Sequence, residues 1–152
     1  MRSNIEAVVI ANGEYPTRKE VLEIINAAPL TVCCDGAADD FIARGGVPDI
    51  IIGDMDSLSD ENKARYSDII IHNPDQETND QTKAVQYLLS RGITRIAIVG
   101  ATGRREDHTI ANIALTAEYM AMGAEVVSYT DSGCFIPCRD NKRLQCAPNA
   151  QV

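Results

Sequence analysis

Ile50-Ile51-Ile52-Gly53-Asp54-Met55-Asp56-Ser57 is an apolar, β-branched run that gives way to a glycine and two carboxylates. A short run that is apolar at every position is typical of a strand buried on both faces, as in a parallel sheet. Three other predicted strands also lead to acidic residues: residues 30–34 to Asp35, residues 69–74 to Asp75 and Glu77, and residues 96–99 to Asp107. In an open α/β sheet the ligand crevice lies outside the carboxyl ends of the strands. We therefore expect these carboxylates to face one cleft, and such a cleft needs a cation.

Segments with helical periodicity alternate with the apolar runs. This alternation predicts an α/β fold with a Rossmann-like, open and mostly parallel sheet and with helices on both of its faces. Strands are expected at residues 7–11, 30–34, 50–53, 69–74, 95–99 and 125–129. Helices are expected at residues 17–28, 36–44, about 79–91 and 107–122, with a further short helix opening at 57–60.

Two of these helices carry recognisable start signals. Thr17 is predicted to cap the first helix, and Thr78 or Asn79 is predicted to cap the helix that ends near Arg91. The helix predicted at residues 107–122 carries an apolar series at helical spacing, consisting of Ile110, Ile113, Ala114, Ala117 and Met120.

The pattern changes at Gly133. Residues 134–138 form a short strand-like run and residues 139–142 a polar turn, and no further pair of strand and helix follows. We expect residues 1–132 to form one α/β domain that carries the cleft. Residues 133–152 are expected to be a linker and the beginning of an incomplete, truncated all-β domain, from which a segment is missing.

Composition and charge limit the classes of function. With 152 residues, 45% of them hydrophobic, the chain can bury one sizeable core. Its formal net charge of −8 argues against a nucleic-acid partner, because binding a phosphate backbone normally needs a face rich in Lys and Arg. No stretch approaches the roughly 20 apolar residues of a membrane span, and the first residues do not resemble a signal peptide. The five cysteines include no C-x-x-C pair, so reduced and mostly buried thiols are expected. We expect a soluble, cytoplasmic protein with no membrane partner.

Asp54 and Asp56 form the sharpest local motif, because they stand two residues apart directly after a strand. Mg²⁺ takes oxygen ligands and keeps waters and substrate phosphates in its remaining positions, and two such carboxylates suit it. The alternative is that Asp56 or Ser57 merely caps the short helix that follows. The other acids at strand ends favour the metal site.

Asp80 and Lys83 lie three residues apart at the predicted start of a helix. They share one helical face, near free backbone N–H groups that favour anions. A carboxylate for the metal and an ammonium for a phosphate suit that position, although the pair would also make an ordinary exposed ion pair.

The segment Gly100-Ala101-Thr102-Gly103-Arg104-Arg105-Glu106-Asp107-His108 follows a strand and opens the long helix. A glycine-containing turn with arginines at a helix start is a natural phosphate site, because backbone N–H groups and guanidinium forks both bind oxyanions. The segment matches neither the Walker A pattern nor G-x-G-x-x-G. Asp107 could instead cap the helix, and His108 is more simply interpreted as a structural hydrogen-bonding residue than as a catalytic base.

These motifs, in this order, resemble the thiamine pyrophosphokinase family. Its patterns D-G, G-D-x-D-S, D-Q-x-x-x-D-x-x-K and G-G-R-x-D-H are matched by Asp35-Gly36, by Gly53 to Ser57, by Gln76 with Asp80 and Lys83, and by Arg105 with Asp107-His108. The resemblance extends from Asn12 to about Asp131. Four spaced motifs that agree in order are far more specific than any one of them. One departure is Arg104, which stands where the family usually has the second glycine of G-G-R.

The resemblance implies an enzyme, a transferase that moves the pyrophosphoryl group of ATP to the hydroxyl of thiamine and gives thiamine diphosphate and AMP. It implies that Mg²⁺ is held by Asp54, Asp56 and Asp80. It implies that Lys83 and Arg105 meet the triphosphate of ATP. The residues implied to line the same cleft, near the nucleotide or the acceptor, are Asp35, Gln76 and Asp107.

The resemblance also implies a β-sandwich domain after the α/β domain, and a homodimer with thiamine pockets between its subunits. Two other functions stay open. One is a Mg²⁺-dependent phosphohydrolase that uses Asp54 as a nucleophile, since that mechanism also needs D-x-D at a strand end. The other is a module without catalytic activity that senses Mg²⁺-ATP.

Overall fold

The computed structural model describes residues 4–152, so residues 1–3 of the predicted α/β domain lie outside the described part of the chain. Within it, seven strands form one sheet in the order β4-β3-β2-β1-β5-β6-β7. Every neighbouring pair is parallel except β6 and β7, which are antiparallel. The strands are β1 (Ala7–Ile10), β2 (Thr31–Cys34), β3 (Ile50–Gly53), β4 (Ile70–His72), β5 (Arg95–Val99), β6 (Glu125–Tyr129) and β7 (Cys134–Phe135).

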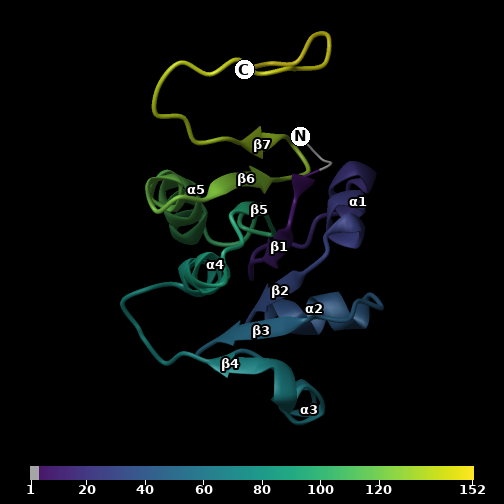
Figure 1. The fold of residues 1–152 in the computed structure, drawn as a ribbon. Helices are drawn as coiled ribbons and strands as arrows, with labels where there is room; N and C mark the ends of the chain where they lie inside the picture. The colour runs from purple at the N-terminus through teal and green to yellow at the C-terminus, as the bar shows by residue number, and fades with distance from the viewer. Residues whose placement is uncertain (1–3) are drawn as a thin grey trace.

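Helices cover both faces of the sheet, as predicted. They are α1 (Lys19–Ala27), α2 (Ala37–Ala43), α3 (Asp60–Arg65), α4 (Asp80–Ser90) and α5 (Glu106–Ala121), with a 3₁₀ turn, η2 (Ser67–Ile69), before β4. Figure 1 shows α4 and α5 on one side of the sheet and α1 and α2 on the other. The fold class expected from the alternating pattern, an open and mostly parallel α/β sheet, is therefore confirmed.

The central strand shows why its residues are apolar at every position. Ala7 and Val9 pack into the core under α4 and α5, whereas Val8 and Ile10 pack into the core under α1 and α2. Alternate side chains of a strand point to opposite faces, so a strand that has helices on both sides must be apolar throughout. All four residues of β1 are buried.

The strand order reverses at β1, which lies between β2 and β5. The loops after β1 and β5 therefore meet, and backbone hydrogen bonds join them: the Gly13 N–H donates to the Gly100 carbonyl (2.7 Å) and the Glu14 N–H to that of Thr102 (2.8 Å). A Cβ atom on Gly13 would lie 2.4 Å from the Gly100 oxygen, so glycine is required for this approach. Ligands of open α/β sheets bind beside such a reversal point.

The cap predicted for the first helix is wrong. The helix α1 begins at Lys19, and neither Thr17 nor the N-cap residue Arg18 caps it with its own side chain. Instead the carboxylate of Asp131, just after β6, accepts hydrogen bonds from the Thr17 hydroxyl (2.8 Å) and from the N–H groups of Thr17 and Arg18 (3.0 to 3.1 Å). A carboxylate is a stronger acceptor than a hydroxyl, and this one comes from a segment 113 residues away.

The apolar series of α5 is not its buried face. Ile110 is 68% exposed, while Thr116 and Tyr119 are buried. The hydroxyl of Tyr119 finds partners on α4, where Thr82 lies 2.7 Å away, so a polar contact joins the two helices. Apolar periodicity alone cannot reveal a helix packed through hydrogen-bonded side chains.

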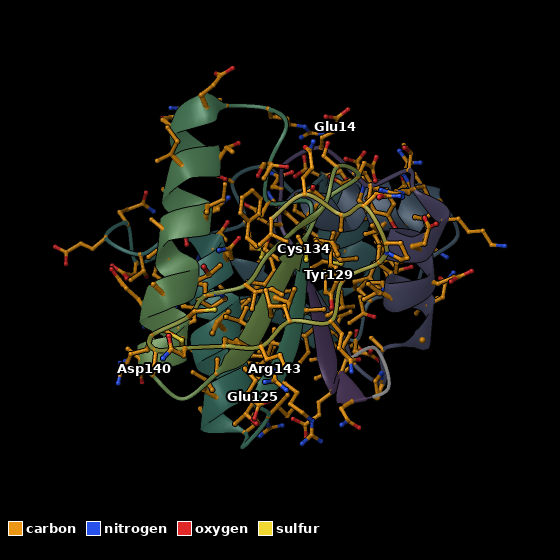
Figure 2. The ribbon with its side chains drawn as sticks, turned by 90° about the horizontal axis from the view of Figure 1, so that it is seen from above. Glu14, Glu125, Tyr129, Cys134, Asp140 and Arg143 are labelled. Atoms are coloured by element: carbon orange, nitrogen blue, oxygen red, sulfur yellow. The ribbon has the colours of Figure 1, made fainter. Side chains whose placement is uncertain are left out.

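The chain after β6 forms the short strand β7 and then, in residues 136–152, neither helix nor strand. Cys134 pairs with Tyr129 of β6, and Figure 2 shows the following segment, with Asp140 and Arg143, running back toward Glu125 at the other end of β6, away from Glu14. The exposed cysteines Cys134, Cys138 and Cys146 correct the expectation of mostly buried thiols, because this segment contributes nothing to the core. A second domain beginning at residue 133 stays a prediction. Among the helices of residues 4–152, none has the length and apolar character needed to cross a membrane.

Candidate active site

Three of the strand-end carboxylates converge as expected. Asp107 does not join them, because it pairs with Arg105, and neither Asp107 nor Asp35 is among the residues that line the cleft. Asp35 after β2 and Asp54 and Asp56 after β3 each offer a carboxylate oxygen, and these three oxygens lie within 4.8 Å of one another. Both connecting turns contain a residue in the left-handed region, Asp35 with φ 45° and Met55 with φ 63°. Such conformations cost energy in a residue other than glycine, and they are found most often where a structure must aim particular side chains.

Asp35 is the buried member of this cluster, with 1% of its surface exposed. Its two carboxylate oxygens accept hydrogen bonds from the N–H groups of Leu58 (2.8 Å) and Ser57 (3.3 Å), so it shapes the turn after the D-x-D motif. Burial raises the pKa of Asp35 to about 6, with Asp56 as a further cause. Asp35 is thus a carboxylate whose charge is poorly stabilised by the protein itself.

Asp54 has the opposite environment. Its Oδ2 accepts a hydrogen bond from the side-chain amide of Gln76 (3.1 Å), and its Oδ1 lies 3.4 Å from the Asp56 N–H. The hydrogen bond from Gln76 is the main reason that the pKa of Asp54 falls to about 2. Gln76 therefore holds Asp54 ionised and in one orientation.

Asp80 is the first residue of α4 and packs against Gly53, the last residue of β3. Asn79 caps this helix, as one of the two predicted residues. The buried ammonium of Lys83 lies 3.3 Å from Asp80 Oδ1 and donates to the carbonyl of Asn73 (2.8 Å), while burial raises the pKa of Asp80. Because the Lys83 side chain is 2% exposed, the alternative of an ordinary exposed ion pair is wrong.

A second wall faces these carboxylates and comes from the turn between β5 and α5. Arg105 donates from Nη2 and Nε to the two carboxylate oxygens of Asp107 (2.6 and 3.1 Å), and this lowers the pKa of Asp107. The helix α5 begins at Glu106 with Arg105 as its N-cap residue, so Asp107 is not the cap. His108 lies at the cleft, and the hydrogen-bonding role expected for it stays a prediction.

Arg104, beside Arg105, reaches across to another element. Its Nη2 lies 3.1 Å from Oδ2 of Asp40 on α2, and its Nη1 lies 3.5 Å from two oxygens of Asn12. Arg104 thus closes the side of the cleft near β1, while Arg105, whose side chain is mostly exposed, lines the cleft beside it.

The two walls enclose a cleft of about 640 Å³ at the carboxyl ends of the strands. The carboxylate wall, as we call it below, consists of Asp54, Asp56 and Asp80 with the neighbouring residues 75–79. The arginine wall consists of Arg104, Arg105 and His108. A ligand that combines a cation with phosphate groups is the complement of such a cleft.

Comparison with known proteins agrees with this geometry. The model of the family described as "Thiamin pyrophosphokinase, catalytic domain" matches residues 21–128. The chain belongs to this family.

The sequence is similar to those of thiamine pyrophosphokinases from a plant and a nematode. The chain is 32% identical over 132 residues to "Thiamine pyrophosphokinase 1" of Oryza sativa subsp. japonica, covering 70% of this chain and 49% of that protein. It is 27% identical over 111 residues to "Thiamin pyrophosphokinase 1" of Caenorhabditis elegans, covering 67% and 45%. The chain therefore spans about half the length of these relatives.

Solved structures of thiamine pyrophosphokinases share the fold. The Bacillus subtilis enzyme gives a TM-score of 0.66 at 19% identity, covering 81% of this chain and 59% of that one. The yeast enzyme gives 0.63 at 20% identity, covering 84% and 59%.

Within this thiamine pyrophosphokinase fold, several residues of the site lie outside the motifs. Asn73 supplies the carbonyl that holds Lys83, and Asn12 supplies oxygens near Arg104. Asn112 on α5 lies between the two walls. A backbone carbonyl or a lone asparagine has no signature in a single sequence, whereas Gly13 directly after a predicted strand is a signal of close approach that could have been used.

Proposed function

We propose that this chain carries the catalytic centre of a thiamine pyrophosphokinase, which transfers the pyrophosphoryl group of ATP to the hydroxyl of thiamine and releases AMP. The observation that carries this proposal is the division of one cleft into a carboxylate wall and an arginine wall, in a member of that family. Phosphoryl and pyrophosphoryl transfer need little covalent help from the protein. They need positioning and charge neutralisation, which this arrangement can supply.

Mg²⁺ fits the donor set. Hard cations prefer carboxylate oxygens, and three such oxygens lie within 4.8 Å of one another. We propose Asp54, Asp56 and Asp80 as ligands, and we add Asp35, whose oxygen belongs to that group. When bound, the ion neutralises phosphate charge. Both oxygens of Asp35 already accept a backbone hydrogen bond, so Asp35 would share its carboxylate between the ion and the turn after β3.

The other residues act on the nucleotide from fixed positions. Lys83 lines the cleft and donates to Asp80, and its positive charge is proposed to attract the phosphates toward the carboxylate wall. Arg105 has its guanidinium oriented by Asp107 and is proposed to meet the triphosphate from the opposite wall. Gln76 is proposed to act indirectly, by keeping the carboxylate of Asp54 ionised and in one orientation. We further propose that the protein works in the cytoplasm as a homodimer.

Product analysis tests the proposal. The chain, and any longer natural form in which it occurs, is incubated with ATP, Mg²⁺ and thiamine, and AMP is separated from ADP. Thiamine-dependent AMP is expected. Asp54→Asn should abolish it, whereas Asp60→Asn on α3, a fully exposed carboxylate outside the cleft, should not.

Other outcomes favour the other functions. ADP as the product would indicate a simple kinase or ATPase. Phosphate release with an aspartyl group that beryllofluoride traps would indicate a phosphohydrolase. Tight binding of Mg²⁺-ATP without turnover would indicate a sensing module.

A further inference from the structure

Asn112 lies where α4, α5 and the turn after β5 meet. Its Nδ2 donates to the carbonyl of Ala101 (3.0 Å), and its Oδ1 accepts from Nδ2 of Asn79 (2.9 Å). Its own backbone carbonyl accepts from the amide of Gln81 (3.2 Å). One half-buried side chain on α5 thus contacts both Asn79, at the start of α4, and Ala101, in the turn that leads to the arginine wall.

The side chain of Asn79 links Asn112 to the first turn of α4. Its Oδ1 accepts from the Thr82 N–H (2.9 Å) and so caps α4, while its Nδ2 is the group that donates to Asn112. Both ends of the Asn79 amide are therefore used. The first turn of α4 begins with Asp80, so the position of this carboxylate depends on a cap that Asn112 holds in place.

A buried contact between Tyr119 and the first turn of α4 keeps α4 and α5 at a fixed separation. Tyr119 on α5 is fully buried, and its hydroxyl lies 2.7 Å from the Thr82 hydroxyl and 3.2 Å from Nε2 of Gln81. A hydrogen-bonded network that is buried resists displacement, because each broken bond leaves an unsatisfied polar group. The turn after β5 is held to α5 by the Asn112 side chain and to the loop after β1 by backbone hydrogen bonds.

We propose that Asn112 is a positioning residue that fixes the separation between the carboxylate wall and the arginine wall. The proposal rests on the proposed function, in which one Mg²⁺-nucleotide contacts both walls. Asn112 acts through Asn79 on Asp80, and through Ala101 on the turn that carries Arg105. Because the ligand must reach both walls at once, a small change in their separation weakens its binding and its alignment.

An isosteric substitution tests the tie. Asn112→Asp keeps the acceptor for Asn79 but places a carboxylate oxygen against the Ala101 carbonyl, and Asn112→Ala removes both contacts. Binding of Mg²⁺ with a non-hydrolysable ATP analogue to the 152-residue chain is measured by calorimetry. We expect about tenfold weaker affinity for both variants, the loss of one to two hydrogen bonds. Thr116→Ala, a buried truncation one turn further along α5, should bind within about twofold of the unsubstituted chain.

The readouts separate positioning from simple loss of structure. A partly unfolded variant also binds more weakly, because reversible unfolding lowers the apparent affinity in proportion to the folded fraction. Urea unfolding of each variant gives that fraction, and misplaced walls lower the affinity that remains after this correction. Asn112→Ala decides the outcome, because it adds no charge to the cleft that Asn112 lines. If Asn112→Ala binds the Mg²⁺-nucleotide like the unsubstituted chain, the proposal is wrong. If the unsubstituted chain fails to bind the Mg²⁺-nucleotide, the proposed function fails and the positioning role fails with it.

Hydrogen exchange gives a second measurement that needs no nucleotide. Asn112→Asp should speed amide exchange in residues 100–105 and in the first turn of α4, with the central strands unchanged. Asn79→Asp keeps the cap of α4 but loses the donor to Asn112, so combining it with Asn112→Ala should add little further loss of affinity. Fully additive losses, or unchanged exchange in residues 100–105, would contradict the tie.

Discussion

Replacing Gly53 by alanine should damage both the fold and the carboxylate wall. Gly53 has φ 148°, a conformation that side chains rarely adopt. A Cβ atom there would lie 2.9 Å from Cγ and Oδ2 of Asp80 and 3.1 Å from Cβ of Asp35. Backbone strain of about 1–3 kcal/mol adds to an overpacking cost of about 1–3 kcal/mol, so the free energy of unfolding should fall by about 2–6 kcal/mol. Because Asp80 must move, Mg²⁺-nucleotide binding should weaken as well.

Gly45→Ala is the matched control. Gly45 also has a positive φ, 86°, but no atom within 4 Å would meet its Cβ. Urea unfolding of both variants therefore separates strain from crowding: Gly45→Ala should lose about 1 kcal/mol and bind the Mg²⁺-nucleotide normally. If Gly53→Ala is as stable as Gly45→Ala and binds as tightly, the close packing of Asp80 on Gly53 is not what the site depends on.

Three other substitutions give distinct expectations. Gln76→Ala removes the hydrogen bond that lowers the pKa of Asp54. As the pH is lowered, Mg²⁺ binding followed by calorimetry should therefore be lost at a higher pH than in the unsubstituted chain. Loss of binding at the same pH in both proteins would contradict this role. Asp131→Ala should lower the free energy of unfolding by about 1 kcal/mol at neutral pH, by removing the acceptor at the start of α1. Since the pKa of Asp131 is lowered by folding, its contribution is present above the ordinary aspartate range and is lost as the pH falls through the folded value, so the difference between the two proteins in urea unfolding should vanish in acid. Burial raises the pKa of Asp35 to about 6, so the metal-free protein should lose stability as the pH rises toward about 6, and Asp35→Asn should remove this part of the pH dependence in urea unfolding. Added Mg²⁺ should raise the melting temperature of Asp35→Asn less than that of the unsubstituted chain.

The sheet was predictable because burial on two faces leaves a strong mark on a sequence. Residues 50–53 and 95–99 are strands with the expected bounds. The carboxyl ends of β2 and β3 bring Asp35, Asp54 and Asp56 together, as the fold class predicts. The start of α4 at Asp80 was also predictable, since Asn79 is a local cap.

Features that depend on distant partners were not predictable. The start of α1 is determined by Asp131, which lies beyond the whole parallel sheet in the sequence. The buried face of α5 was missed because Tyr119 and Thr116 pack through polar contacts, while Ile110 remains exposed. A single sequence shows which residues could bond, and it does not show which of them the fold brings within reach.

The two best-defined carboxylates of the site differ in a way that fits a cation site. Asp54 is kept ionised by Gln76 with a pKa of about 2, whereas burial raises the pKa of Asp35 to about 6. The two oxygens of Asp35 accept from the Ser57 and Leu58 N–H groups, but its charge is buried beside two other acids. Holding Asp35 at φ 45° adds further cost. A bound cation would offset both costs, so the carboxylate cluster fits the metal site proposed above better than a purely structural role.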